Sequence, residues 1–170
     1  MVDIRQETEK DYAEIYNVVK RAFETAEHSD GNEQELVSAL RKGGGYIPEL
    51  SLAAVRDGKI VGYIMFTKIK IGGYEELALA PLAVLPEYQR QRIGAGLINY
   101  AHKTAERLGY HYSVVLGSEN YYPKFGYLPA SRYGIKAPFD VPDKNFMAAR
   151  LNDSKVDIKG TVRYAEEFGI

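Results

Sequence analysis

The sequence predicts a mixed α/β fold, in which a central sheet of parallel and antiparallel strands is flanked by helices. The first indication is residues 77–116, where a helical pattern lies between two apolar strand patterns. Strands joined through a helix usually lie parallel. The second is the pair Asp57-Gly58 between two further strand patterns, which is typical of an antiparallel hairpin. The length of 170 residues fits one domain spanning 1–170.

The N-terminal part predicts one strand and two helices. Residues 2–6 alternate apolar and polar side chains, as a short strand does. Thr8 follows as an N-cap with Asp11 three residues later, and the next apolar residues have helical spacing. Asn32 is a second N-cap, with Glu35 at the capping-box position, and a run of three glycines ends that helix.

The rest of the chain predicts a hairpin, a long helix and several strands. The hairpin comprises residues 50–55 and 60–71. An apolar run at 77–85 predicts a buried strand, and the segment 93–108 has the apolar spacing of an amphipathic helix. The remaining predictions are a strand at 112–116, a short helix at 120–125, and late strands at 146–151 and 161–164.

Composition excludes several functions. The 22 basic and 23 acidic residues give a net charge of -1, so tight binding to a nucleic-acid backbone through overall charge is not expected. The absence of cysteine excludes disulfides, thiolate metal sites and an acyl-cysteine intermediate. The first residues lack a signal-peptide pattern, and no apolar run reaches the roughly 18 residues that span a bilayer. We therefore expect a cytoplasmic protein that binds neither nucleic acid nor membrane.

The segment between the strand at 77–85 and the following helix predicts a ligand site. A polar turn leads into a helix that starts with Gly94 and Gly96. A helix start offers unpaired N–H groups and a partial positive charge, so it favours phosphate, and Arg90 and Arg92 add positive charge. The spacing fits neither a Walker loop nor the dinucleotide fingerprint. The alternative is a tight turn whose glycines only allow close packing.

The motif Gln91-x-x-Gly94-x-Gly96 resembles the pyrophosphate loop of the GNAT family of acetyltransferases. The resemblance implies a GNAT-like acyl-CoA N-acyltransferase fold, a mixed α/β sheet in which a splayed strand pair binds acetyl-CoA. It implies that the pyrophosphate lies on the amides of Arg92, Ile93, Gly94, Ala95, Gly96 and Leu97. It also implies that the pantetheine arm pairs, like an added strand, with Leu82, Ala83 and Val84. An N–H at or near Val84 would then point to the thioester carbonyl.

A second motif, Tyr122-Pro123-Lys124-Phe125-Gly126-Tyr127, is similar to another signature of this family. The resemblance implies that Tyr122 protonates the CoA thiolate. A phenol of pKa about 10 is a suitable acid for a thiolate of pKa about 8.5. The alternative is a packed or exposed aromatic residue, since the chain has 14 tyrosines. Asn120 is a further candidate CoA contact, although Val115 stands where many members have an asparagine.

Weaker similarities extend from the first strand to the last and resemble the YhbS-like branch of the family. They are Glu33-x-x-Leu36-Val37-x-x-Leu40-Arg41, Leu116-Gly117-Ser118 and Gly160-x-Val162-x-Tyr164. Only the two motifs described before are specific, so the family assignment depends mainly on them.

Glu33 is the candidate catalytic base, on the helix that lines the acceptor side in this fold, although an acid in a first turn also complements the helix dipole. Glu119 could act through water. The histidines, His28, His102 and His111, show no metal-ligand spacing, so no metal is predicted. His102 is expected on the polar face of its helix.

Charge is distributed unevenly along the chain. Residues 1–36 carry ten acidic and four basic residues, and residues 90–107 carry one acidic and four basic residues. The basic segment coincides with the predicted pyrophosphate site, and the acidic segment could attract a cationic amine. The alternative for both segments is a solvated helix face.

We therefore expect an acetyl-CoA-dependent N-acetyltransferase. It would move an acetyl group to a primary amine of a small molecule or peptide, by direct transfer in a ternary complex. Its expected partners are acetyl-CoA and the amine, and the chain would act as a monomer or homodimer. One alternative is a non-catalytic acyl-CoA-binding sensor or regulatory module, and another is a protein that binds a different phosphorylated ligand.

Overall fold

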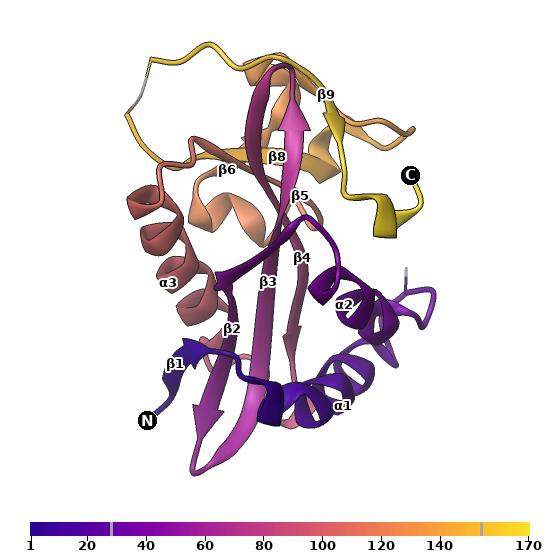
Figure 1. Cartoon of the computed structure of the whole chain (residues 1–170), viewed down its shortest axis with the longest axis vertical. Helices are drawn as coiled ribbons and strands as arrows, with labels where there is room; N and C mark the ends of the chain where they lie inside the picture. Colours follow the sequence, from indigo (N-terminus) through magenta and orange to yellow (C-terminus); the bar gives the residue numbers. More distant parts are fainter. Residues whose placement is uncertain (28, 154) are drawn as a thin grey trace.

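Figure 1 shows the computed structural model of the chain, which describes residues 1–27, 29–153 and 155–170. His28 lies outside the described residues. Within them, a sheet of nine strands runs in the order β1-β2-β3-β4-β5-β8-β6, while β9 pairs with β3 and β7 with β9. The strands are β1 (Asp3–Gln6), β2 (Tyr46–Arg56), β3 (Lys59–Ile71), β4 (Tyr74–Val84), β5 (Tyr112–Leu116), β6 (Tyr127–Pro129), β7 (Ile135–Lys136), β8 (Phe146–Arg150) and β9 (Gly160–Arg163).

The helices cover both faces of the sheet. They are α1 (Tyr12–Phe23), α2 (Glu33–Arg41) and α3 (Ile93–Arg107). The first two lie together on one face, and α3 lies on the other (Figure 1). Helix α3 approaches β3 closely because residue 62 is a glycine: a Cβ there would lie 3.0 Å from Cγ2 of Ile93. The predicted mixed α/β fold is confirmed, and most of its strand pairs are antiparallel.

Strands β4 and β5 form the splayed pair that the resemblance implied. They pair in parallel only at Leu77 with Ser113 and at Ala78 with Val114. Beyond these residues β4 continues to Val84 along β3, and β5 diverges from it. A β-bulge in β4 accompanies the divergence, since Leu82 lies opposite Ile64 whereas Leu79 lies opposite Phe66. The result is an open edge along the second half of β4.

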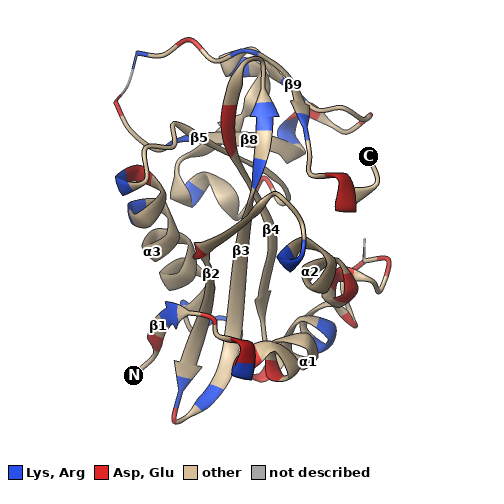
Figure 2. Ribbon diagram, viewed as in Figure 1, with Lys and Arg blue, Asp and Glu red and all other residues tan. Residues whose placement is uncertain are grey.

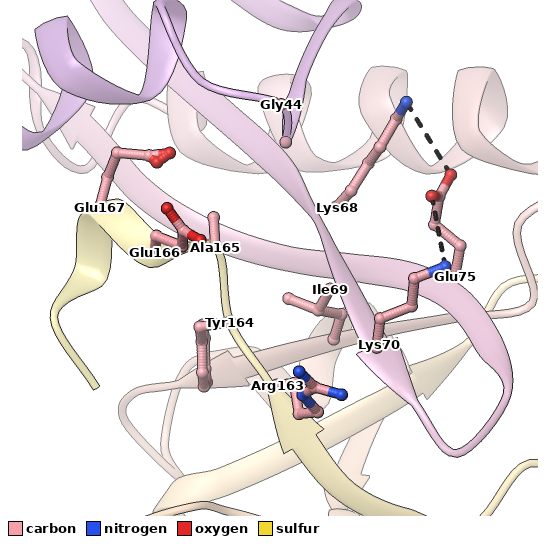
Figure 3. Close-up of a pocket in the computed structure, with 11 residues that line it drawn as sticks. Gly44, Lys68, Ile69, Lys70, Glu75, Arg163, Tyr164, Ala165, Glu166 and Glu167 are labelled. Atoms are coloured by element: carbon pink, nitrogen blue, oxygen red, sulfur yellow. Dashed lines mark ion pairs between the residues drawn. The ribbon is translucent and has the colours of Figure 1, made fainter.

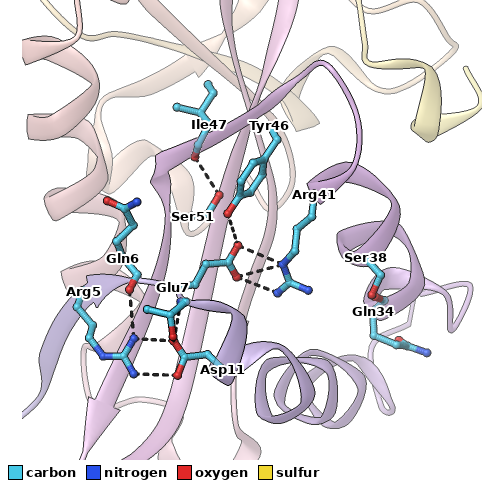
Figure 4. Close-up of polar contacts among 11 residues, drawn as sticks. Arg5, Gln6, Glu7, Asp11, Gln34, Ser38, Arg41, Tyr46, Ile47 and Ser51 are labelled. Atoms are coloured by element: carbon cyan, nitrogen blue, oxygen red, sulfur yellow. Dashed lines mark hydrogen bonds and ion pairs between the residues drawn. The ribbon is translucent and has the colours of Figure 1, made fainter.

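A buried ion pair attaches the C-terminal end of α2 to the sheet (Figure 4). Nη2 of Arg41 lies 2.8 Å from Oε1 of Glu7, and neither side chain is more than 7% exposed. The Tyr46 hydroxyl donates to Glu7 at 2.6 Å, and the guanidinium lies 3.9 Å from the centre of the Tyr12 ring. With these contacts the Glu7 carboxylate has the hydrogen bonds that its burial requires.

The capping prediction for α2 is confirmed for the position of the N-cap and wrong for the capping box. Asn32 is the N-cap, but its side chain makes no capping hydrogen bond. Glu35 instead accepts a hydrogen bond from the hydroxyl of Tyr16 on α1. The first turn is held by other bonds, in which Asp30 accepts from the Asn32 amide at 2.9 Å. By contrast, the box of Thr8 and Asp11 before α1 is confirmed.

His102 does not lie on a polar helix face, so that prediction is also wrong. Its ring packs against Phe66 of β3 and Tyr127 of β6, with ring centres 6.1 and 5.5 Å apart. Its Nε2 forms a hydrogen bond of 3.0 Å with the Tyr127 hydroxyl. This burial lowers the pKa of His102 to about 4. The imidazole is therefore neutral at pH 7 and acts as a packed polar residue.

Stability is expected to fall as the pH is lowered from about 6.5 to 4, because the unfolded chain binds a proton at His102 that the folded chain excludes. The shift corresponds to a loss of up to about 3 kcal/mol. Urea unfolding of the wild type and of His102→Gln at several pH values measures this effect. The variant should lack this part of the pH dependence, and equal pH dependence in both proteins would contradict the prediction.

Candidate functional site

A cavity of about 780 Å³ lies between the start of α3 and the 3₁₀ turn Tyr122–Phe125. Two side chains from the open edge of β4, Leu82 and Val84, contribute to its wall. The complete lining consists of Leu82, Val84, Tyr88, Gln89, Arg90, Arg92, Ile93, Gly94, Ala95, Tyr121, Lys124 and Phe125. The cavity therefore joins the predicted anion loop to the splay of the sheet.

The backbone of the loop is arranged to present amides at the start of α3. Arg90 and Arg92 adopt positive φ angles of 63° and 66°, a conformation that non-glycine residues seldom adopt and that is common at functional sites. Arg92 is the N-cap, and the Gly96 amide already bonds its carbonyl at 3.0 Å. The amides of the first turn, at residues 93–95, have no partner within the helix. Of the six predicted amides, those of residues 93–95 are thus free of helix hydrogen bonds, whereas that of Gly96 is not.

The two loop glycines have different roles. A Cβ at Gly94 would lie 2.7 Å from the hydroxyl oxygen of Tyr121, inside the cavity. A Cβ at Gly96 would instead lie 3.3 Å from Cδ1 of Ile4 on β1. Gly94 therefore keeps space for a ligand, whereas Gly96 allows α3 to pack on the sheet. The geometry thus favours the ligand-site interpretation at Gly94 and the packing interpretation at Gly96.

The cavity is lined by positive charge. Arg90, Arg92 and Lys124 contribute to its wall, and the lining given by the described residues includes no carboxylate. The positive end of the α3 dipole points to the same place. A hollow of about 530 Å³ beside β3 and β9 differs in this respect (Figure 3), because Glu75 lies 3.9 and 3.7 Å from Nζ of Lys68 and Lys70. Of these two, the cavity at α3 is the one suited to a polyanion.

The open edge of β4 offers backbone groups to a ligand. The Leu85 amide donates to the Val61 carbonyl at 2.9 Å, while Val84 lies opposite Gly62. The alternation of an antiparallel ladder therefore turns the amide of Val84 away from β3, and that of Leu82 likewise. These amides face the side from which β5 has diverged. An extended ligand can pair there like an additional strand.

Tyr122 is partly buried beside this cavity. Its ring packs against Tyr121 and Tyr127, with ring centres 5.1 and 5.7 Å apart. A methyl group at Gly117 would overlap the Tyr122 ring, so the ring lies directly on that backbone. Burial raises the pKa of Tyr122 well above its usual value, and the hydroxyl is therefore protonated at neutral pH. Among the described residues, no hydrogen bond holds this hydroxyl.

Several residues that the sequence placed at the cofactor site lie elsewhere. Gln91 turns to β2, where its Oε1 accepts from Arg56 at 2.7 Å. Ala83 lies opposite Tyr63 and directs its backbone groups to β3. Leu97 is fully buried in the core, and Asn120 is exposed and does not line the cavity.

The structure adds cavity residues that the sequence had not assigned to the site. Tyr88, Gln89, Tyr121 and Phe125 line the cavity, and Gln89 also donates to the Val84 carbonyl at 3.2 Å. Tyr121 and Phe125 had a weak signal, since Tyr121 directly precedes the second motif and Phe125 belongs to it. The others have no sequence pattern that marks them as ligand contacts, because the folding of the turn brings them there.

The candidate bases lie apart from the cavity lining. Glu33 accepts a hydrogen bond from Ser29 at 2.7 Å and lines an acidic hollow of about 390 Å³ at the α1–α2 connection. Figure 2 shows acidic residues gathered around this connection. Glu119 is held by Asn145 at 2.7 Å and by Lys144. Hydrogen bonds from its own amide, Asn145 and Lys144 lower the pKa of Glu119, which makes it a weaker base.

Two further searches cover the described part of the chain. It contains no group of three or more His, Cys, Asp or Glu side chains arranged to hold a metal ion. None of its helices has the length and apolar character needed to cross a membrane.

A splayed parallel strand pair beside a helix start that is lined by cations defines an acyl-CoA-binding transferase. The model of the acetyltransferase (GNAT) family matches residues 9–127, and the chain belongs to this family. It is accordingly an N-acetyltransferase with acetyl-CoA as co-substrate, as the two motifs predicted.

Relatives at the level of the whole chain support this assignment. The uncharacterized N-acetyltransferase YjhQ of Escherichia coli K12 is 34% identical over 92% of this chain and 88% of its own length. The uncharacterized N-acetyltransferase YhbS of the same strain is 30% identical over 97% of both chains. The predicted similarity to the YhbS-like branch is therefore confirmed.

Two solved structures have the same fold. The crystal structure of YhbS from Escherichia coli in complex with CoA superposes with a TM-score of 0.89 at 28% identity, covering 99% of this chain and 92% of that chain. A GNAT family acetyltransferase from Brucella melitensis in complex with acetyl-CoA gives a TM-score of 0.82 at 30% identity, covering 99% and 98%.

Proposed function

We propose that this protein transfers the acetyl group of acetyl-CoA directly to a primary amine of a small molecule or peptide, in a ternary complex. The observation that carries the proposal is the cavity at the start of α3, which is continuous with the open edge of β4. Two of the structurally similar family members are in complex with CoA or acetyl-CoA. The chain offers matching features for the pyrophosphate, the pantetheine arm and the thioester of that co-substrate.

The pyrophosphate is placed on the amides of residues 93–95. Residues 93–95 line a cavity whose wall also contains Arg90, Arg92 and Lys124. Hydrogen bonds from backbone amides at a helix start, together with cations, are a common way to bind phosphate. The pantetheine arm is placed along β4, where it pairs with the backbone of Leu82 and Val84.

The reaction is a single displacement at the thioester. The amine nitrogen attacks the carbonyl carbon, and the amide of Val84 or Leu82 stabilises the charge that develops on the oxygen. The carbon–sulfur bond then breaks, and Tyr122 gives its hydroxyl proton to the sulfur. The proton that leaves the new amide nitrogen returns to Tyr122, so protons balance over the cycle. The absence of cysteine is consistent with a route that needs no acyl-enzyme.

The acceptor must react as a free amine, so an ammonium ion has to lose a proton before it attacks. The acidic surface around the α1–α2 connection attracts cationic molecules, and Glu33 lies half-buried in it. Glu33 as the base that removes the ammonium proton stays a prediction. The state of the chain as a monomer or homodimer also stays a prediction.

A screen of amines tests the proposal. Because the chain has no cysteine, a chromogenic thiol reagent detects only the CoA that is released. Spermidine, tyramine, lysine and an alanine-starting peptide are suitable probes, each compared with acetyl-CoA alone. We expect at least one amine class to raise the rate of CoA release at least about tenfold above the rate with acetyl-CoA alone. Double-reciprocal plots of the initial rate, with both substrates varied, should then give intersecting lines, as a ternary complex requires.

Two results would contradict the proposal. Mass spectrometry of protein incubated with acetyl-CoA alone should show the unmodified chain, and an acetylated intermediate would exclude direct transfer. Tight acetyl-CoA binding without release by any amine would favour the non-catalytic sensor.

A further inference from the structure

A buried polar chain lies directly behind Tyr122. The Tyr127 hydroxyl forms hydrogen bonds with Nε2 of His102 at 3.0 Å and with Oγ of Ser113 at 2.8 Å. Tyr127 and Ser113 are completely buried. The three residues come from β6, α3 and β5, so the chain joins three elements that surround the site.

The Tyr127 hydroxyl can donate one hydrogen bond and accept another, and its two neighbours satisfy both. The pKa of His102 is lowered to about 4 by burial, so the neutral ring has one nitrogen that donates and one that accepts. A tyrosine hydroxyl can accept from one neighbour and donate to the other. With both neighbours in place, none of the three polar groups is left unpaired at this point. The position of the Tyr127 ring is thereby determined from two sides.

The ring of Tyr127 in turn determines the position of Tyr122. The two rings meet edge to face, with centres 5.7 Å apart and planes at 79°. No hydrogen bond to a described residue holds the Tyr122 hydroxyl, so its direction depends on what the ring packs against. That packing consists of the backbone of Gly117 and the rings of Tyr121 and Tyr127.

We propose that Tyr127, held by His102 and Ser113, is a positioning residue that aims the Tyr122 hydroxyl at the departing sulfur of CoA. This inference rests on the proposed role of Tyr122 as the acid. Proton transfer requires the donor within hydrogen-bond distance of the sulfur, and small misplacements reduce rates strongly. The chain also connects the acid to α3, the helix whose start binds the pyrophosphate in the proposed function.

The test compares Tyr127→Phe in two backgrounds. The substitution keeps the ring and removes only the hydroxyl. In the wild-type background we expect kcat to fall about tenfold, with KM for acetyl-CoA changed less than about twofold. In the Tyr122→Phe background the same substitution should change kcat less than about twofold, because there is no acid left to aim. The most active amine of the screen serves as the acceptor.

Conservative variants keep the test valid if Tyr127→Phe folds poorly. His102→Gln retains a side-chain donor for the Tyr127 hydroxyl, so it should keep most of the activity that His102→Ala loses. Tyr46→Phe is the control, since it also removes a hydrogen-bonded tyrosine hydroxyl, here from a half-buried residue bonded to Glu7 at 2.6 Å. It should change kcat less than about twofold even where it lowers the melting temperature.

The outcomes separate this inference from the proposed function. The positioning role alone would be overturned if Tyr122→Phe lowers kcat and Tyr127→Phe lowers kcat by the same factor in the wild-type and Tyr122→Phe backgrounds. An unimpaired Tyr122→Phe would overturn the acid role and the positioning role together. If His102→Gln lowered kcat as much as His102→Ala, the positioning role would also be contradicted. The hydrogen-bond donor that glutamine retains for the Tyr127 hydroxyl would then not contribute to the rate.

Discussion

Replacing Tyr122 by Phe is expected to lower kcat by at least about 100-fold, while acetyl-CoA affinity changes less than about threefold. The ring, with its contacts to Tyr121, Tyr127 and Gly117, is retained in the variant. Only the hydroxyl is lost, and no described residue is hydrogen-bonded to it. The loss should therefore appear in the chemical step rather than in folding or binding. Steady-state kinetics and calorimetric titration with acetyl-CoA measure the two effects separately.

The control for this experiment is Tyr100→Phe. Tyr100 lies on α3 and is 44% exposed, so loss of its hydroxyl should leave kcat within about twofold of the wild type. If Tyr122→Phe retained the wild-type kcat, Tyr122 would be only a packed aromatic residue, and the acid would have to be found elsewhere.

Replacing Gly94 by Asp is expected to reduce acetyl-CoA affinity by at least about 100-fold. The new Cβ would lie 2.7 Å from the Tyr121 hydroxyl oxygen, so the side chain enters the cavity. Its carboxylate would occupy the place of the pyrophosphate among the amides of residues 93–95 and would repel it. Calorimetric titration of the variant with acetyl-CoA measures the loss.

Gly96→Ala is the matched control, two residues along the same helix. Its Cβ meets only the end of the Ile4 side chain, at 3.3 Å, so acetyl-CoA binding should remain within about twofold, with at most a modest loss of stability. Retained binding by Gly94→Asp would remove the pyrophosphate from the start of α3. Loss of binding by Gly96→Ala would show that helix packing, and not the cavity, controls affinity.

Local signals predicted the elements well because they depend on neighbours in sequence. The turn at Asp57-Gly58 adopts positive φ at both residues, 51° and 75°, as the dipeptide indicated. The apolar spacing of α3 and the strand patterns around it gave the parallel crossover. The box at Thr8 formed for the same reason, since both partners lie within one turn.

The errors concern side chains whose surroundings come from distant segments. Nothing near His102 in sequence reveals that Phe66 and Tyr127 cover it. Glu35 is three residues from Asn32, but its partner Tyr16 lies on another helix. Gln91, the first residue of the motif and still only a predicted cofactor contact, likewise has its side-chain partner, Arg56, on the distant strand β2. In each case a contact with a distant segment outweighs a preference set by neighbouring residues, because that local preference contributes little free energy by itself.

The sequence by itself determined the class of fold and the family, and it located the candidate anion-binding loop and the candidate acid Tyr122, because each depends on residue types at short, regular spacing. Only the tertiary structure decided which groups of these motifs face the cavity. It assigned Gly94 to the cavity and Gly96 to packing, opened the edge of β4 beyond Ala78, and placed Tyr127 behind Tyr122. The physical reason is that backbone alternation, helix packing and ring contacts between distant strands set these directions, and no segment carries that information alone.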